Sequence, residues 1–309
     1  MTSIEAVKSN WSNLHSTIRG GVWMLFSALF FAGLGISIRM STREVHSFEI
    51  VFFRNFFNLM FMLPWLWKIG LSGLRTEVFG LHVTRASLGL ISMFFWFTGV
   101  SMMPLAEATS LGFTAPLFAT IGAALILRET VRLRRWAAVL IGFAGTLIIL
   151  RPGTEVITLP AIYMIAGAVF VACSFIAVKM LTRTESPNTM VLMMVALITP
   201  VSLIPALFVW QWPSIETWMW LVMVGFSATG GHIFFNRAMA TADASAILPF
   251  DYSRLLFVAV LAFIIFNEVP DIYTWIGGAI IFGSTIYIAQ REAVAARPAV
   301  TGPSGGEMR

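Results

Sequence analysis

The sequence predicts an all-α polytopic membrane protein with ten transmembrane helices, arranged as two inverted five-helix repeats. Three observations lead to this class. Of the 309 residues, 58% are hydrophobic and 11% are charged, whereas a soluble domain carries roughly 25% charged residues. Ten apolar segments each approach the roughly 20 residues that cross a bilayer. The second half of the chain also repeats the first, which indicates a duplicated membrane fold.

The duplication is clearest near the end of each half, where an acidic residue precedes a tryptophan and an apolar helix. The two copies align at an offset of 139 residues there, and the first helices of the halves align at an offset of 140. A fixed acidic and aromatic frame at one offset is hard to obtain by chance. The matched pairs are Glu129 with Glu268, Trp136 with Trp275, Met24 with Met164, and Ala28 with Ala168.

The apolar segments set the domain boundaries. We expect a cytoplasmic arm at 1–18, a first repeat at 19–150, a linker at 151–158, a second repeat at 159–290 and a disordered tail at 291–309. The linker RPGTEVIT separates the halves. The expected helices lie near 20–38, 48–67, 84–102, 105–127, 135–150, 159–178, 189–209, 217–236, 244–266 and 272–289.

Basic residues predict the orientation of the chain in the membrane. With the N-terminus in the cytoplasm, 14 of the 20 Lys and Arg residues fall in inner loops and termini, 3 fall in outer loops, and 3 lie within spans. Both termini are therefore expected in the cytoplasm, with the protein in the cell inner membrane. Five helices per half is an odd number, so the second half runs opposite to the first.

Several function classes are excluded by what the sequence lacks. The single cysteine, Cys173, permits no disulfide or cysteine-based metal site within the chain. The net charge of +5 is dispersed rather than gathered into a nucleic-acid-binding face. No nucleotide-binding, metalloprotease or nucleophile-elbow motif is present. We expect no enzyme activity, no cofactor and no metal. Because the repeats give symmetry within one chain, a monomer suffices and a homodimer is not required.

The sequence resembles the EamA branch of the drug/metabolite transporter superfamily. The resemblance rests on the two five-helix halves, the closing glutamates with their tryptophans, and the small-residue entries into the fourth and ninth helices. Within that branch, Phe-Arg-Asn at 53–55 and Phe-Asn-Arg-Ala at 235–238 resemble the bacterial uptake subgroup. The resemblance implies a central cavity between the halves, a small-molecule substrate, and a carrier for riboflavin or S-adenosylmethionine. An exporter of amino acids or other metabolites is the alternative, and a membrane receptor or scaffold without transport is a third.

An ionisable residue inside a span usually faces the bundle interior or a wet cavity. Arg54 lies deep in the second helix with Asn58 one turn on, as a donor pair for a substrate carboxylate, phosphate or ring carbonyl. The alternative is an arginine held by a neighbouring carboxylate. Arg85 is expected near the cytoplasmic start of the third helix, where its side chain would extend to the interface.

The ninth helix carries a proline beside a pair of charges. Asp251 and Arg254 are three residues apart and can pair on one face, and Pro249 frees a backbone carbonyl near them. This arrangement is typical of a binding site or gate, although an internal salt bridge would satisfy itself. On the eighth helix, His232 and Asn236 lie one turn apart. They are candidates for substrate contact, and His232 for proton transfer.

The remaining candidates are aromatic and acidic. Trp96, Phe113 and Tyr252 are expected to line the cavity and stack on a planar ligand. Glu107 and Asp243 match across the repeat and suit helix N-termini, while Glu129 and Glu268 are expected to be structural or gating. Substrate charge separates the two favoured ligands. Riboflavin is neutral and suits Arg or Asn donors, whereas the sulfonium of S-adenosylmethionine requires a carboxylate such as Asp251 or Glu107.

Overall fold

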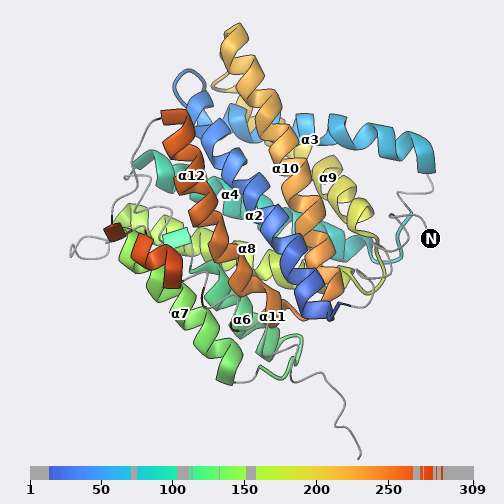
Figure 1. Cartoon of the computed structure of the whole chain (residues 1–309). Helices are drawn as coiled ribbons and strands as arrows, with labels where there is room; N and C mark the ends of the chain where they lie inside the picture. Colours follow the sequence, from blue (N-terminus) through green and yellow to red (C-terminus); the bar gives the residue numbers. More distant parts are fainter. Residues whose placement is uncertain are drawn as a thin grey trace, which may run out of the picture.

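In the computed structural model, every described element is a helix (Figure 1). The structure describes residues 14–70, 75–102, 111–131 except 113, 133–150, 158–266, 272–280 except 274, and positions 283 and 287. The elements are α2 (Ser16–Ser41), α3 (Ser47–Ile69), α4 (Phe79–Met102), α6 (Ala115–Leu125), α7 (Leu133–Leu150), α8 (Leu159–Leu181), α9 (Pro187–Leu207), α10 (Ile215–Thr241), α11 (Ala244–Ile247), the 3₁₀ helix η2 (Leu248–Ser253) and α12 (Arg254–Phe266).

Within these described residues, six helices are long and apolar enough to cross a membrane. This number identifies a polytopic membrane protein, while the count of ten remains a prediction. Polar residues cap the helix starts: α8 begins after Thr158, whose hydroxyl accepts from Ala161 N, and α10 begins after Ser214, whose hydroxyl accepts from Thr217 N. The six spans are Ser16–Ser41, Ser47–Lys68, Leu159–Leu181, Pro187–Leu207, Ile215–Thr241 and Ala244–Ile265.

The most extensive contact joins α2 to α10, which lie side by side in Figure 1. Glycines on α10 let aromatic rings of α2 lie directly on its backbone. A Cβ at Gly231 would meet the ring of Phe31 at 2.6 Å, and a Cβ at Gly230 would meet the ring of Phe30 at 2.3 Å. Ser27 Oγ donates to the Gly231 carbonyl at 2.9 Å. Small residues therefore set the close approach of these helices.

The second most extensive contact joins α4 to α8. It is equivalent to the first, except that the donor and acceptor positions are exchanged. Here Ser92 Oγ donates to the Gly167 carbonyl at 2.9 Å. Position 167 is the equivalent of position 27 at the offset of 140, and position 92 is the equivalent of 231 at 139. Each crossing thus has one serine hydroxyl donating to one glycine carbonyl. The helix that supplies the donor belongs to the first repeat both times.

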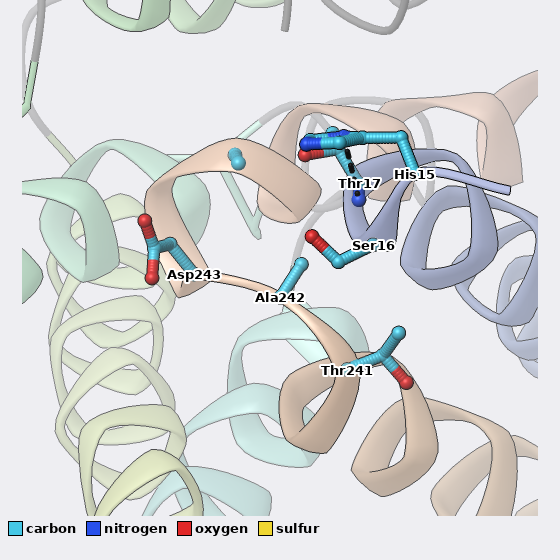
Figure 2. Close-up of a pocket in the computed structure, with 7 residues that line it drawn as sticks. His15, Ser16, Thr17, Thr241, Ala242 and Asp243 are labelled. Carbon is cyan, nitrogen blue, oxygen red and sulfur yellow. Dashed lines mark hydrogen bonds between the residues drawn. The ribbon is translucent and has the colours of Figure 1, made fainter. Parts of the chain in front are cut away.

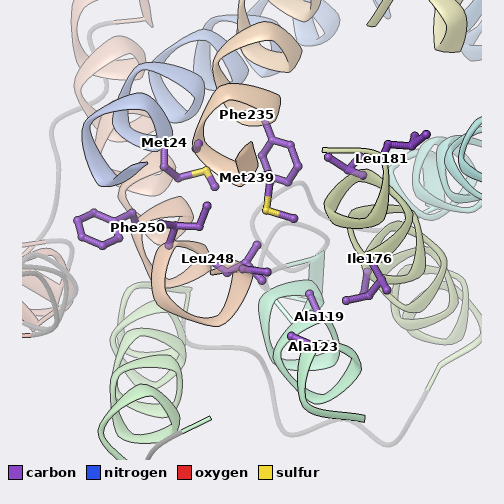
Figure 3. Packing of buried hydrophobic residues seen from close by; sticks show 14 of the residues in the cluster. Met24, Ala119, Ala123, Ile176, Leu181, Phe235, Met239, Leu248 and Phe250 are labelled. Carbon is purple, nitrogen blue, oxygen red and sulfur yellow. The ribbon is translucent and has the colours of Figure 1, made fainter. Parts of the chain in front are cut away.

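A buried apolar cluster joins helices of both halves. Its residues come from α2, α6, α8, α9, α10, α11 and η2, and Figure 3 shows the side chains of Met24, Ala119, Phe235 and Leu248 converging between helices of this set. The contacts again occur in equivalent pairs, since α6 packs on α8 as α12 packs on α2. The core therefore lies between the halves rather than inside either one, so that neither half buries its apolar faces alone.

Replacing Gly225 with alanine tests the close packing of α10 on α3. The added Cβ would lie 2.2 Å from Phe57 Cβ and 3.0 Å from its carbonyl carbon, so one of the two backbones must shift. We expect a loss of about 1–3 kcal/mol in stability, measured as a lower melting temperature in detergent. Gly35→Ala is the control, because nothing lies within 4 Å of the position that its Cβ would take. Equal melting temperatures for the two variants would contradict the packing.

Candidate functional site

Arg54 of α3 is buried and points at α10. Its Nη2 lies 2.8 Å from His232 Nε2, and its Nη1 donates to Asn55 Oδ1 at 3.3 Å and contacts Met93 Sδ at 3.4 Å. An arginine can only donate, so His232 Nε2 accepts and the imidazole proton resides on Nδ1. In this conformation His232 is therefore an acceptor for Arg54 rather than a free proton carrier. Asn58 does not pair with Arg54, because its Oδ1 accepts from Thr229 Oγ1 at 2.9 Å.

Arg54 lies between equivalent positions of the two halves. Met93 on α4 is the equivalent of His232 on α10, at the offset of 139. Arg54 contacts both of them. A side chain that touches both members of an equivalent pair lies near the axis that relates the two halves. In duplicated transporter folds the substrate site lies at that interface.

The expectation that Arg85 reaches the membrane interface is wrong. The residue is 1% exposed, and it donates to the Met190 carbonyl at 2.5 Å and to Asn236 Oδ1 at 3.3 Å. The reason is that α4 begins at Phe79, earlier than the apolar run suggested, so Arg85 lies almost two turns inside the helix and faces α9 and α10. Arg85 is therefore a site candidate that sequence reasoning missed. The sequence did contain one indication: His82 and Arg85 are three residues apart and therefore lie on the same face of a helix.

Arg54 and Arg85 thus face one stripe of α10. Their partners His232 and Asn236 are one turn apart, which is about 6 Å along the helix axis. Over the part of the chain that the structure describes, neither guanidinium forms an ion pair with a carboxylate. Two positively charged groups held near one another in a buried site repel each other. A ligand with an electron-rich or anionic group would relieve that repulsion.

The predicted break in the ninth helix is present, since η2 interrupts the path from α11 to α12. Arg254 Nη2 lies 2.9 Å from Asp251 Oδ2, and Asp251 is 3% exposed. The Arg254 guanidinium also lies 5.8 Å from the ring centre of Phe31, which contacts His232 edge-on at 5.2 Å. Phe31 therefore connects the Asp251–Arg254 pair to the Arg54–His232 pair. The Asp251 carboxylate is occupied by Arg254 in this conformation.

The aromatic candidates occupy different places. Tyr252 is buried and packs on α7, where a Cβ at Gly142 would meet its ring at 2.6 Å. Trp96 is half-buried beside Gly112, and its ring meets Phe97 edge-on at 5.4 Å. The structure does not bring these two rings against Arg54. The remaining candidates Phe113, Glu107 and Glu268 lie outside the described residues.

Glu129 crosses between the halves to hold the start of the broken helix. It accepts from Ala244 N at 3.1 Å, from Ser245 N at 3.2 Å and from Ser245 Oγ at 2.8 Å. Asp243 is the residue that precedes α11. Nearby, Lys179 of α8 donates to the carbonyls of Met239 and Ala242 at the end of α10. A carboxylate of the first half therefore satisfies the free N–H groups of a helix in the second.

A polar pocket of about 300 Å³ opens beside this junction. Figure 2 shows it between the start of α2, at His15, Ser16 and Thr17, and the turn from α10 to α11, at Thr241 to Asp243. Thr241 lies nine residues beyond His232 on α10, about 14 Å along its axis. The pocket is therefore distinct from the arginine stripe and lies at one end of the bundle.

Two loop carboxylates make equivalent contacts at the starts of α10 and α4. Glu44, after α2, accepts from Ser214 N and Ser214 Oγ, each at 2.7 Å, and from Thr217 Oγ1. Glu185, after α8, accepts from Thr76 Oγ1 and lies 3.7 Å from His82 Nε2. The hydrogen bond from the Ser214 hydroxyl, then that from Thr217, lowers the pKa of Glu44. Its contribution to stability is therefore present at neutral pH and lost as the pH falls through that lowered pKa.

A family model for EamA-like transporters matches residues 18–151 and 158–290, which together cover most of the chain. The chain belongs to the EamA-like transporter family. Helix α2 begins at Ser16, two residues before the first matched segment, and α8 begins at Leu159, one residue into the second.

Two transporters are similar to this chain over nearly its full length. A riboflavin transporter of Vibrio cholerae is 34% identical over 288 residues, which cover 92% of this chain and 97% of that protein. An S-adenosylmethionine uptake transporter of Rickettsia prowazekii is 32% identical over 279 residues, covering 90% and 95%. A solved crystal structure with 18% identity matches 89% of this chain and 98% of its own, with a TM-score of 0.77, which shows a shared fold.

Removing the Glu129 carboxylate tests the junction between the halves. Glu129→Ala leaves two backbone N–H groups and one hydroxyl of α11 without this acceptor, and we expect a cost of about 1–2 kcal/mol, typical of a lost helix cap. The measurement is the melting temperature of the purified protein. Glu216→Ala removes an exposed carboxylate from the start of α10 and should change it by much less. A Glu129→Ala variant as stable as Glu216→Ala would show that the cap is unimportant.

Proposed function

We propose that this chain is a secondary transporter that imports riboflavin across the bacterial inner membrane by alternating access. Its membership of the EamA-like family and its 34% identity to a riboflavin transporter support transport of a small metabolite. Because curated relatives of similar identity differ in substrate, the choice of riboflavin depends on the site. The observation that carries it is the pair of buried guanidinium groups, at Arg54 and Arg85, facing the His232–Asn236 stripe.

The charges of the site favour a neutral, acceptor-rich ligand. Arg54 and Arg85 offer donors without a carboxylate partner over the described part of the chain, and riboflavin carries ring carbonyls and ring nitrogens that accept hydrogen bonds. S-adenosylmethionine is a cation and would be repelled by the same groups. The buried acid of this region, Asp251, is held by Arg254. A cationic substrate would first have to break that pair.

In this proposal, the residues act in two groups. Arg54, Arg85 and Asn236 donate to the ring acceptors, and His232 holds the orientation of Arg54. Asn58 lies one turn from Arg54 on α3, where Thr229 donates to it, and Arg254 and Asp251 flank the site across Phe31. Trp96, Phe113 and Tyr252 form the aromatic walls as the path opens. Glu107, Glu129, Asp243 and Glu268 act at the helix ends as structural or gating groups.

Alternating access follows from the exchange of equivalent contacts between two inverted five-helix repeats, 19–150 and 159–290. The matching Ser27–Gly231 and Ser92–Gly167 bonds support such a pair of halves.

The directions of the helices also support two inverted halves. The contacts of Trp23 with Phe234 and of Phe30 with Phe226 make α2 and α10 antiparallel, as expected of the first and eighth of ten crossings. With both termini cytoplasmic, the Glu129 junction and the pocket of Figure 2 lie at the cytoplasmic end.

The test is uptake into proteoliposomes, with riboflavin and S-adenosylmethionine measured side by side. We expect saturable riboflavin uptake that Arg54→Gln weakens by about 10- to 100-fold in apparent affinity, since a buried hydrogen bond to a charged group contributes about 1.5–3 kcal/mol. Arg43→Gln, at an exposed loop arginine, should behave as wild type.

If wild type takes up S-adenosylmethionine and Asp251→Asn does not, the substrate is a cation and the riboflavin proposal is wrong. Transport of neither solute would remove the uptake proposal and leave export of another metabolite as the alternative.

A further inference from the structure

We propose that His82 and Glu185 form the proton-binding site that couples transport to a proton gradient, by closing the cytoplasmic end when His82 is protonated. The inference rests on the proposed function for its direction in the membrane. It assigns a proton as the second ligand of the transporter, at a place distinct from the arginine stripe.

The geometry fits a site for one proton. His82 lies in the first turn of α4 and is 1% exposed. Its Nε2 is 3.7 Å from Glu185 Oε1, and neither ring nitrogen makes a hydrogen bond over the described part of the chain. Buried imidazole nitrogens are normally bonded. A ring left unbonded beside a carboxylate can accept a proton and then close the remaining gap to a short charge-assisted bond.

Burial lowers the pKa of His82 below its usual value, and the neighbouring charges act in opposite directions. Glu185, on the loop before α9, favours the protonated ring, whereas Arg85, one turn on along α4, opposes it. Thr76 adds a hydroxyl that donates to the same Glu185 oxygen. Protonation therefore strengthens the contact between the start of α4 and the α8–α9 loop. Loss of the proton leaves Glu185 with Thr76 alone and relieves the repulsion on Arg85.

The opposite end of the molecule has the equivalent contact without a histidine. Glu44 is held by the hydroxyls of Ser214 and Thr217 and by Ser214 N. Hydroxyl groups do not titrate near neutral pH, whereas histidine does. Only the Glu185 contact of this pair should therefore respond to pH between about 5 and 8. The difference allows a proton gradient to act on one gate and not on the other.

The coupling follows from the position of Arg85 between the two sites. While the outer side is open, His82 takes up a proton, which tightens the Glu185 contact at the cytoplasmic end, and Arg85 holds the substrate acceptor one turn away. Opening of the cytoplasmic end separates His82 from Glu185. The imidazolium then loses its carboxylate while Arg85 remains near, so it releases the proton to the cytoplasm together with the substrate.

The first test measures the gate itself and needs no substrate. Spin labels at Glu77→Cys and Thr184→Cys, both exposed positions, in a Cys173→Ala background, report the distance between the start of α4 and the α8–α9 loop. Because burial lowers the pKa of His82, we expect the short-distance population to fall as the pH rises through the range below the ordinary histidine pKa of about 6.5, and to become independent of pH in His82→Gln. His46→Gln, at an exposed loop histidine on the opposite end, is the matched control and should keep the wild-type response.

Glu185→Gln provides a second route if His82→Gln fails to fold, and it should also abolish the pH response. A wild-type distance that does not change with pH, or a response retained in both variants, would overturn the proton site.

The second test measures proton movement in proteoliposomes with an internal pH dye. Riboflavin uptake by wild type should acidify the interior, and His82→Gln should carry riboflavin down its gradient without acidification. Riboflavin uptake by wild type without acidification would overturn this inference and leave the proposed function intact. Absence of any riboflavin uptake would instead remove the proposed substrate, and the distance measurement would then decide the proton site alone.

Discussion

Burial of two guanidinium groups against one stripe of α10 is the interaction on which the rest of the structure depends. An arginine cannot lose its charge at neutral pH, so Arg54 and Arg85 must find acceptors in the interior. His232, Asn236 and the Met190 carbonyl supply them. These acceptors are within reach because glycines let α2, α3 and α10 approach closely. The close helix packing and the polar residues on α10 therefore serve one requirement, which is to supply acceptors to two buried guanidinium groups.

The repeat explains both the symmetry of the scaffold and the asymmetry of the site. The Ser27–Gly231 and Ser92–Gly167 bonds are equivalent and hold the two main crossings in the same way. Polar residues depart from that symmetry. Arg54 has a methionine, Met194, at its equivalent position, and His232 has Met93. A duplicated apolar scaffold thus carries a single polar site near its axis, and the two ends differ in whether a histidine joins the carboxylate contact.

The sequence predicted the features that depend on local pattern. Helix type, most spans, the break at Pro249 and the Asp251–Arg254 pair follow from apolar runs, a proline and a three-residue spacing, and the structure contains them. The resemblance to the EamA-like family is confirmed by the family match. Pairings between distant segments could not be predicted in this way. The contact of Arg54 with His232, a residue 178 positions away, is such a pairing, and no local pattern indicated it. Arg85 was misplaced because Gly80, His82 and Thr84 interrupt the apolar run at the start of α4 and hid the true start of the helix.

The most direct test of the account is the equilibrium affinity of the purified protein for riboflavin, measured by flavin fluorescence in wild type, Arg54→Gln and Arg85→Gln. If both guanidinium groups bind the ligand, each variant should bind riboflavin about tenfold or more weakly while eluting as a folded protein. A folded Arg54→Gln or Arg85→Gln variant with wild-type affinity would contradict the claim that the buried arginine stripe is the substrate site.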